Sequence, residues 1–355
     1  MRVYNKGIFK IFFTAAMLTA FFTGCNEAPK TEQNSEVQEE AKFLEKENFN
    51  NPLVLQRADP FVTKAGDGMY YFIATAPEYD RIEIRKSSTI NGISDATAKV
   101  IWNKHESGAM GSHIWAPELH KIDGVWYVYF AAAPAEDVWK IRIWVLSNAS
   151  ADPTTGEWKE EGQIETNRDE FALDATTFVH NKQRYLIWAE KGGNSNLYIA
   201  KMIDPTHIDT TQTLIAEPTL DWERIGHNVN EGPSVLIRNG KIFVTFSASA
   251  TDANYAMGLL YADQDADLLD AASWTKLPEP VFATNDSLKR FGPGHNSFTV
   301  SEDGKRDIMI YHARDYKDID GEPLHDPNRN TRARAIEWDE NGFPVFGQDK
   351  DDNDM

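Results

Sequence analysis

The chain repeats one sequence pattern five times, and this repetition constrains its fold more than any other feature. In each unit a short apolar segment ends in a tight turn and leads into a strand rich in aromatic and β-branched residues, as in RADPFVTKAGDGMYYFIAT. The units begin at Arg57, Trp115, Leu173, Asn230 and Gly294. Asp-Gly, Asn-Gly or Asn-Lys turns between such runs predict β-hairpins, and no long stretch has helical periodicity.

The spacing of the repeat indicates the architecture. One marker residue recurs in each unit: Asp59, Glu118, Asp174, Glu231 and His295. Successive markers are 59, 56, 57 and 64 residues apart. A tryptophan also recurs late in each unit, at Trp102, Trp158, Trp222, Trp274 and Trp338. Periods of this order are typical of propeller blades rather than helical arrays. We therefore predict an all-β, five-bladed β-propeller with a central active-site channel over residues 50–347.

A propeller brings residues together that are distant in the sequence, because equivalent strands of all blades line one channel. We expect Asp59, Asp174 and Glu231 to converge with His295 around one pocket. Asp174 is the most unusual of them, since it interrupts the apolar stretch FALDATTF. Burying a carboxylate is costly unless it is paired or used. Three carboxylates in one pocket predict acid/base chemistry.

The amino terminus resembles a bacterial export signal. Basic residues precede the apolar run IFFTAAMLTAFF, which is too short to span a bilayer and ends just before Cys25, the only cysteine. We predict a lipoprotein signal peptide over residues 1–24, lipidation of Cys25 and a polar tether over 25–49. The protein would then be held at a membrane by its lipid anchor only, facing the periplasm or the cell exterior. An ordinary signal peptide with an incidental cysteine is the alternative.

The charge balance limits the partners. Residues 1–24 hold three of the 36 Lys and Arg residues and none of the 55 acids, so the mature chain has a net charge of −22. Such a surface disfavours nucleic acid and would also repel polyanionic glycans. A neutral sugar is the more suitable ligand. The last residues, 348–355, are predicted to be a solvated acidic tail.

Four motifs in blade order, RADP, ALDAT, NEGPS and GPGHNSF, resemble those of glycoside hydrolase family 43, the five-bladed arabinanases, arabinofuranosidases and xylosidases. The likeness extends over residues 50–347. It implies that Asp59 is the general base, Glu231 the general acid and Asp174 the third carboxylate. Segments around GHNVNEGPS and YHARDYKD most resemble exo-acting α-L-arabinofuranosidases, which implies release of terminal arabinose from arabinan, arabinoxylan or arabino-oligosaccharides of plant cell walls.

The three carboxylates are suited to glycoside hydrolysis independently of the family resemblance. An inverting glycosidase needs an acid and a base about 6.5–9.5 Å apart, and a sugar-sized channel allows that separation. The charge of Asp174 would raise the pKa of Glu231. A β-xylosidase or endo-arabinanase on the same fold is the alternative, although long loops around TDANY and HARDYKDIDGEPLHDPNRN favour a pocket for one terminal sugar. A non-catalytic glycan-binding propeller is the alternative from another class, and the complete trio counts against it.

Other residues are predicted to hold substrate. An aromatic face suits the C–H surface of a sugar, so Trp115 is expected to form a subsite wall that Phe61 and Ile114 extend; core packing is the alternative for Trp115. One of the arginines that close the fifth unit, Arg329 in preference to Arg332, is expected to bind substrate hydroxyls or a catalytic carboxylate.

His295 is the candidate metal residue. The resemblance implies that it holds an axial calcium or other cation, directly or through water, and a turn histidine is the alternative. Calcium prefers oxygen ligands, so a single imidazole points to an indirect role. No cofactor is expected to be required for the chemistry.

Overall fold

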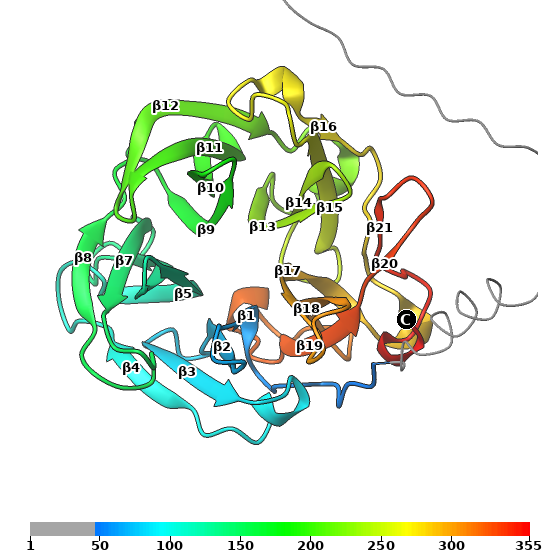
Figure 1. Cartoon of the computed structure of the whole chain (residues 1–355), viewed down its shortest axis with the longest axis horizontal. Helices are drawn as coiled ribbons and strands as arrows, with labels where there is room; N and C mark the ends of the chain where they lie inside the picture. Colours follow the sequence, from blue (N-terminus) through cyan, green and yellow to red (C-terminus); the bar gives the residue numbers. More distant parts are fainter. Residues whose placement is uncertain (1–46) are drawn as a thin grey trace, which may run out of the picture. The chain divides into compact units, whose positions relative to one another are not determined.

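The computed structural model describes residues 47–355, which form five β-sheets arranged as blades around a central axis and one small two-stranded sheet (Figure 1). The predicted all-β, five-bladed propeller is confirmed. The predicted signal peptide, the lipidation site Cys25 and nearly all of the tether lie outside the described residues. Within residues 47–355, no helix is long and apolar enough to cross a bilayer.

Each blade is an antiparallel meander in chain order. The first blade comprises β1 (Ala58–Lys64), β2 (Tyr70–Thr75), β3 (Arg81–Ser87) and β4 (Lys99–Asn103). The second comprises β5 (Ser112–Ile122), β6 (Val125–Ala133), β7 (Arg142–Asn148) and β8 (Lys159–Gln163). The third comprises β9 (Ala172–His180), β10 (Gln183–Gly192), β11 (Asn194–Asp204) and β12 (His207–Ala216).

The remaining blades follow the same plan. The fourth comprises β13 (Asn230–Arg238), β14 (Lys241–Ala248), β15 (Ala256–Asp263) and β16 (Thr275–Lys276). The fifth comprises β17 (Phe291–Val300), β18 (Asp307–Arg314) and β19 (Asn330–Ala335), followed by the two-stranded β20 (Glu337–Trp338) and β21 (Pro344–Val345). Short 3₁₀ turns lie in the connections: η1 (Asn91–Ile93), η2 (Asp221–Glu223), η3 (Ala271–Ser273), η4 (Asp286–Leu288), η5 (Pro323–His325) and η6 (Asp352–Asp354).

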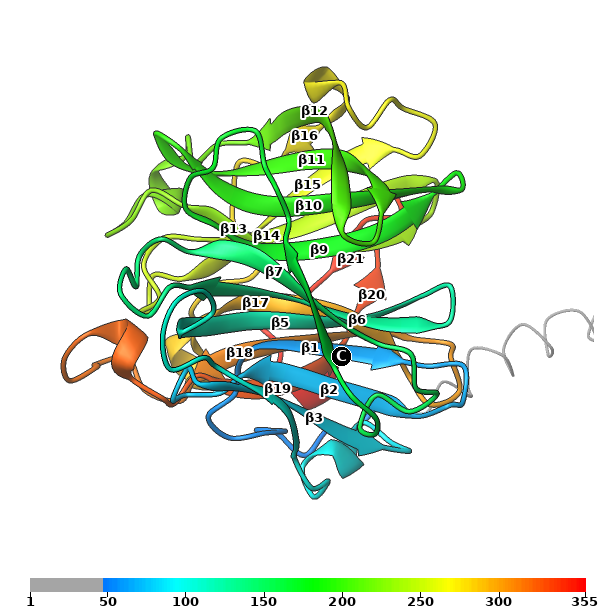
Figure 2. The ribbon, with the colours of Figure 1, turned by 90° about the vertical axis from the view of Figure 1, so that its left-hand side faces the viewer.

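The first strand of every blade is the innermost one. β1, β5, β9, β13 and β17 pack against one another in succession, and β17 packs back on β1 to close the ring. The hairpins within blades use the predicted two-residue turns, such as Asp123-Gly124 and Asn239-Gly240, where both residues have positive φ as type I′ turns require. Figure 2 shows the sheets edge-on, with the β18–β19 connection (orange) projecting beyond them.

The start of the domain closes the last blade. β19 would otherwise leave an open edge, but Leu53 N donates to Thr331 O over 2.8 Å and Thr331 N donates to Val54 O over 2.9 Å. Phe49, Leu53 and Val54 are also buried in the core beside β18 and β19. Covering an exposed strand edge removes a site for aggregation and joins the two ends of the ring.

The carboxyl-terminal segment differs from the prediction. Residues 348–355 are not a solvated acidic tail, because Asp352 and Met355 are buried against the fifth blade. Asp352 accepts hydrogen bonds from Tyr311 Oη over 2.7 Å and from Asn51 Nδ2 over 3.0 Å, and Arg332 Nη1 lies 3.4 Å from it. The prediction failed because buried arginine and tyrosine side chains on β18 and β19 need a carboxylate partner, which the composition of the tail does not reveal.

Asp352→Ala is expected to lower the free energy of unfolding by about 3 kcal/mol, because it leaves the buried partners of that carboxylate unpaired. Urea denaturation followed by tryptophan fluorescence measures the change. Asp349→Ala, at an exposed residue of the same segment, is the control and should change stability by less than about 0.5 kcal/mol. Equal stability of the two variants would contradict the packed tail.

Candidate active site

An irregularity in the innermost strands places the functional side chains. Pairing with the second strand shifts register in β1, β5, β9, β13 and β17. One residue with left-handed φ recurs at the matching position of every blade: Asp59 (53°), Ala116 (43°), Asp174 (56°), Gly232 (55°) and His295 (43°). β5 and β17 each contain a second one three residues earlier, His113 (53°) and Gly292 (57°). A bulge re-aims the side chains around it, and positive φ at residues other than glycine costs energy and is concentrated at functional sites. Each blade therefore turns one short segment toward the axis.

This alignment identifies the matching residue in the second blade, for which the sequence predicts no catalytic acid. Ala116, and not Glu118, is equivalent to Asp59 and Asp174, because it has the left-handed conformation. Glu118 lies two residues farther along β5, where it is buried and contacts His120 Nε2 over 2.8 Å. The second blade therefore contributes no carboxylate to the cavity.

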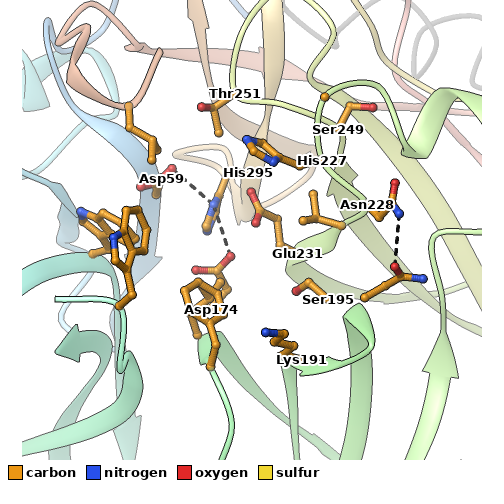
Figure 3. A pocket seen from close by; sticks show the side chains of 18 of the residues that line it. Asp59, Asp174, Lys191, Ser195, His227, Asn228, Glu231, Ser249, Thr251 and His295 are labelled. Carbon is orange, nitrogen blue, oxygen red and sulfur yellow. Dashed lines mark hydrogen bonds and ion pairs between the residues drawn. The ribbon is translucent and has the colours of Figure 1, made fainter. Parts of the chain in front are cut away.

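A cavity of about 560 Å³ lies at the channel mouth (Figure 3). As predicted, Asp59, Asp174, Glu231 and His295 come together in its wall, from four different blades. Thr251 and Leu324 also line it, so the two long loops do border the mouth as expected.

Asp59 is held as an anion. Its Oδ1 lies 3.2 Å from Arg329 Nη1 and 3.3 Å from His295 Nδ1, and Thr75 Oγ1 donates to Oδ2 over 2.6 Å. Burial acts to raise the pKa of Asp59, but the opposing effects, led by the charge of Arg329, outweigh it and hold the pKa well below its usual range. A buried carboxylate that stays ionised is suited to accept a proton.

In contrast to Asp59, Glu231 and Asp174 both have raised pKa values. Burial, assisted by the charge of Asp59, raises the pKa of Glu231 to about 7, although Tyr255 and Arg329 act to lower it. Burial also raises the pKa of Asp174 well above its usual range, and the charges of Glu231 and Asp59 add to that effect. The sequence predicts that the charge of Asp174 raises the pKa of Glu231, whereas burial and the charge of Asp59 are the causes found for Glu231. The structure raises the pKa of both Glu231 and Asp174, so this pair retains a proton where Asp59 is ionised.

Hydrogen bonds fix the pair. Tyr255 Oη donates to Glu231 Oε1 over 2.8 Å. Asp174 Oδ2 accepts from the backbone N–H of Gly232 over 3.0 Å, so this carboxyl holds the backbone immediately after Glu231. Asp174 therefore has a geometric role as well as an electrostatic one.

One side of the cavity is aromatic. Trp115 lines it and stacks on His113 with ring centroids 4.2 Å apart. Trp139 also lines it, and 57% of this residue is exposed. Trp139 was not predicted as a site residue, because the β6–β7 loop that carries it is outside the repeat.

The prediction that Phe61 and Ile114 extend this wall is wrong. Ile114 is 1% exposed and packs in the core between the first two blades, since neighbouring residues of a strand face opposite sides. Phe61 packs against the same core, with its ring 4.9 Å from His120. Simple alternation would place Phe61 on the side of Asp59, but the register shift between Ala58 and Phe61 turns it away.

The two arginines predicted to bind substrate, Arg329 and Arg332, lie in different places. Arg329 lines the cavity beside Asp59, as expected. Arg332 does not line it and instead pairs with Asp315 and Asp352, so its prediction as a substrate ligand is wrong. Arg332 lies within β19 and pairs with Asp352 of the carboxyl-terminal segment, which the sequence predicts to be solvated.

The position of His295 bears on metal binding. Its Nδ1 faces Asp59 Oδ1 at 3.3 Å and Asp174 Oδ2 at 3.9 Å (Figure 3). Among residues 47–355, no group of three or more His, Cys, Asp or Glu side chains is arranged to hold a metal ion. The side chains therefore do not fit a directly coordinated cation, and a cation held through water stays a prediction.

The other side of the cavity is polar and was missed from the sequence. Lys191, at the end of β10, and Ser195, at the start of β11, come from the third blade, and His227 and Asn228 come from the connection that leads into β13 (Figure 3). Asn194 of β11 also lines the cavity. Ser195 N donates to Asn228 O over 3.2 Å, which joins the two blades at the rim. These positions are not part of the repeated pattern. The resemblance includes His227 and Asn228 in the segment GHNVNEGPS but assigns them no role.

Comparison with known proteins gives concordant matches. The model of the family described as "Glycosyl hydrolases family 43" matches residues 49–344. An "Extracellular exo-alpha-(1->5)-L-arabinofuranosidase" of Streptomyces avermitilis is 56% identical over 303 residues, which cover 84% of this chain and 63% of that protein. The match thus spans less than two thirds of that relative. A protein of the same name from Streptomyces chartreusis is 54% identical over 279 residues, covering 78% of this chain and 85% of the relative.

A solved structure agrees with these matches. The crystal structure of an alpha-L-arabinofuranosidase from Lactobacillus brevis superposes with a TM-score of 0.85 at 48% identity, over 87% of this chain and 99% of the other.

Proposed function

This chain belongs to glycoside hydrolase family 43, and from that premise we propose that it is an exo-acting, inverting α-L-arabinofuranosidase. Its substrates are arabinan and other neutral plant glycans that end in α-L-arabinofuranose. The observation that carries the proposal is the opposite protonation of two carboxyls in one cavity, Asp59 ionised and Glu231 with a pKa of about 7.

Each carboxyl has one task. Glu231 protonates the glycosidic oxygen as the bond to the leaving group breaks, and Asp59 takes a proton from the water that attacks the anomeric carbon from the opposite face. Arg329, His295 and Thr75 hold Asp59 in its ionised form. Trp115 and Trp139 offer aromatic surface to the sugar, and Arg329 is placed to bind a substrate hydroxyl beside Asp59.

The substrate class and exo action are supported by the relatives and by the loops. Both Streptomyces relatives carry exo-arabinofuranosidase names, and Thr251 and Leu324 bring loop residues to the cavity wall. We expect debranched arabinan to release monomeric arabinose from the first minutes, as judged by product chromatography. Early oligosaccharides would indicate an endo-arabinanase, and release from xylosides alone would indicate a β-xylosidase.

The pH dependence follows from the two pKa shifts. kcat/KM is expected to fall as the pH rises through about 7, because Glu231 then loses the proton that it must donate. On the acid side, activity should persist below the usual range of an aspartate, because the pKa of Asp59 is lowered and it stays ionised. Rates on an aryl arabinofuranoside across a pH series measure both limbs. Full activity two units above neutrality would exclude Glu231 as the acid.

Export is supported by the word "extracellular" in the names of the Streptomyces relatives. Anchoring through acylated Cys25 is the finer part of this proposal. Fatty-acid labelling of the wild type that is lost in Cys25→Ser would support it, and labelling that persists in the variant would contradict it.

A further inference from the structure

Two buried rings contact the proposed base and acid, and the steps above do not use them as a unit. Tyr255, directly before β15, and His312, on β18, stack with centroids 5.7 Å apart and planes 10° apart. Tyr255 is 1% exposed and His312 is fully buried. A side chain at Gly294 would place its Cβ 2.5 Å from the Tyr255 ring, so glycine at this position makes room for the stack.

Each ring holds one of the two carboxylate residues. Tyr255 Oη donates to Glu231 Oε1 over 2.8 Å. His312 Nδ1 accepts the backbone N–H of Asp59 over 3.0 Å. That N–H belongs to the left-handed residue of the β1 bulge, so His312 satisfies the backbone donor of a residue in an unfavourable conformation.

The imidazole of His312 is neutral. Nδ1 accepts a hydrogen bond, so the ring proton is on Nε2, and burial lowers the pKa of His312 well below its usual range. Within residues 47–355, His312 Nε2 has no hydrogen-bond partner. An unpaired buried N–H is costly, and an apolar side chain would fill the space without that cost. What a histidine provides at position 312, and an apolar residue would not, is therefore the hydrogen-bond acceptor at Nδ1.

We propose that Tyr255 and His312 are a pair of positioning residues that sets the placement of the acid relative to the base. The hydroxyl orients Glu231, the imidazole fixes the bulge that aims Asp59, and the stacked rings join the two. This inference rests on the roles proposed above for Asp59 and Glu231.

The charged groups around Glu231 influence its pKa, and therefore the pH at which activity is lost. Asp59 on β1 and Asp174 on β9 are the acidic neighbours, Arg329 before β19 is the cation, and His295 on β17 lies between the two aspartates. The hydrogen bond from Tyr255 stabilises ionised Glu231 and lowers its pKa. Removing that hydroxyl should therefore move the loss of activity to higher pH.

The first test is Tyr255→Phe, which keeps the ring and removes the donor. We expect the alkaline limb of kcat/KM to shift upward by about one pH unit and kcat at its optimum to fall roughly tenfold. Tyr311→Phe is the matched control, because Tyr311 is also fully buried and donates to a carboxylate, Asp352 Oδ1, over 2.7 Å. Its pH profile should coincide with that of the wild type.

The second test separates the acceptor from the packing. His312→Asn can present an amide oxygen where Nδ1 lies, whereas His312→Leu cannot. With both variants folded by circular dichroism, the leucine variant should lose kcat at least tenfold more than the asparagine variant while KM changes little. Equal losses in the two variants, or an unshifted alkaline limb in Tyr255→Phe, would overturn the proposal.

Failure of this inference differs from failure of the proposed function. A wild-type protein without activity on any arabinofuranoside would refute the function itself. An active wild type with a bell-shaped profile, together with a Tyr255→Phe profile that coincides with it, would refute only the positioning pair.

Discussion

Asp59→Ala is expected to reduce kcat/KM by about 10⁴-fold on every arabinofuranoside, whatever its leaving group. The reason is that water activation is needed in each case and no other carboxylate can replace Asp59. Asp174 and Glu231 line the same cavity, but both have raised pKa values and so resist ionisation. Steady-state kinetics on arabino-oligosaccharides and aryl arabinofuranosides measure the loss.

Two further variants serve as controls for this interpretation of Asp59→Ala. Asp59→Asn keeps the shape of the side chain and should be as inactive as Asp59→Ala, because the amide cannot accept the proton. Asp95→Ala, at an exposed aspartate of the same blade, should retain wild-type rates. A loss of less than about tenfold in Asp59→Asn would show that Asp59 is not the base.

Glu231→Ala should have the second large effect, and its size should depend on the leaving group. On arabino-oligosaccharides, whose leaving alkoxide needs a proton, we expect a loss of about 10³–10⁴-fold. On 2,4-dinitrophenyl arabinofuranoside, whose leaving group departs as a stable anion, the loss should be far smaller. A series of aryl glycosides of graded phenol pKa measures this trend.

The matched comparison for the acid is the same series with Asp59→Ala. That variant should be equally impaired across the series, because the base acts on water and not on the leaving group. If Glu231→Ala lost the same factor on good and poor leaving groups, another residue would have to be the acid.

The repeat made the fold and the carboxylates predictable. Equivalent innermost strands meet at the axis, so residues at one repeat position, such as Asp59 and Asp174, had to converge. Arg329 and Trp115 were also placed correctly at the cavity. Trp115, on the innermost strand β5, owes its place to the repeated geometry, whereas Arg329, just before β19, was predicted only as one of the arginines that close the fifth unit.

The errors arose where local geometry departs from the regular pattern. The bulge in β1 turns Phe61 toward the core, where regular alternation along the strand would place it beside Asp59. Arg332 and the carboxyl-terminal segment were misjudged together, because the pairing of Arg332 with Asp352 is a tertiary contact that composition cannot reveal.

The supporting residues could not be found from the repeat either. Tyr255 and His312 come from different blades and meet only because β15 and β18 lie next to β17. Their hydrogen bonds to Glu231 and Asp59 depend on side-chain directions within a closed ring. Trp139 is in a loop whose length and sequence are independent of the repeat.

The most direct test of the account is the configuration of the first product. Proton NMR at early times, before mutarotation, distinguishes the anomers of arabinose released from an α-linked substrate. If Asp59 activates water and no glycosyl-enzyme forms, the first product must be β-arabinofuranose. Initial appearance of α-arabinofuranose would contradict the inverting mechanism and the role assigned to Asp59.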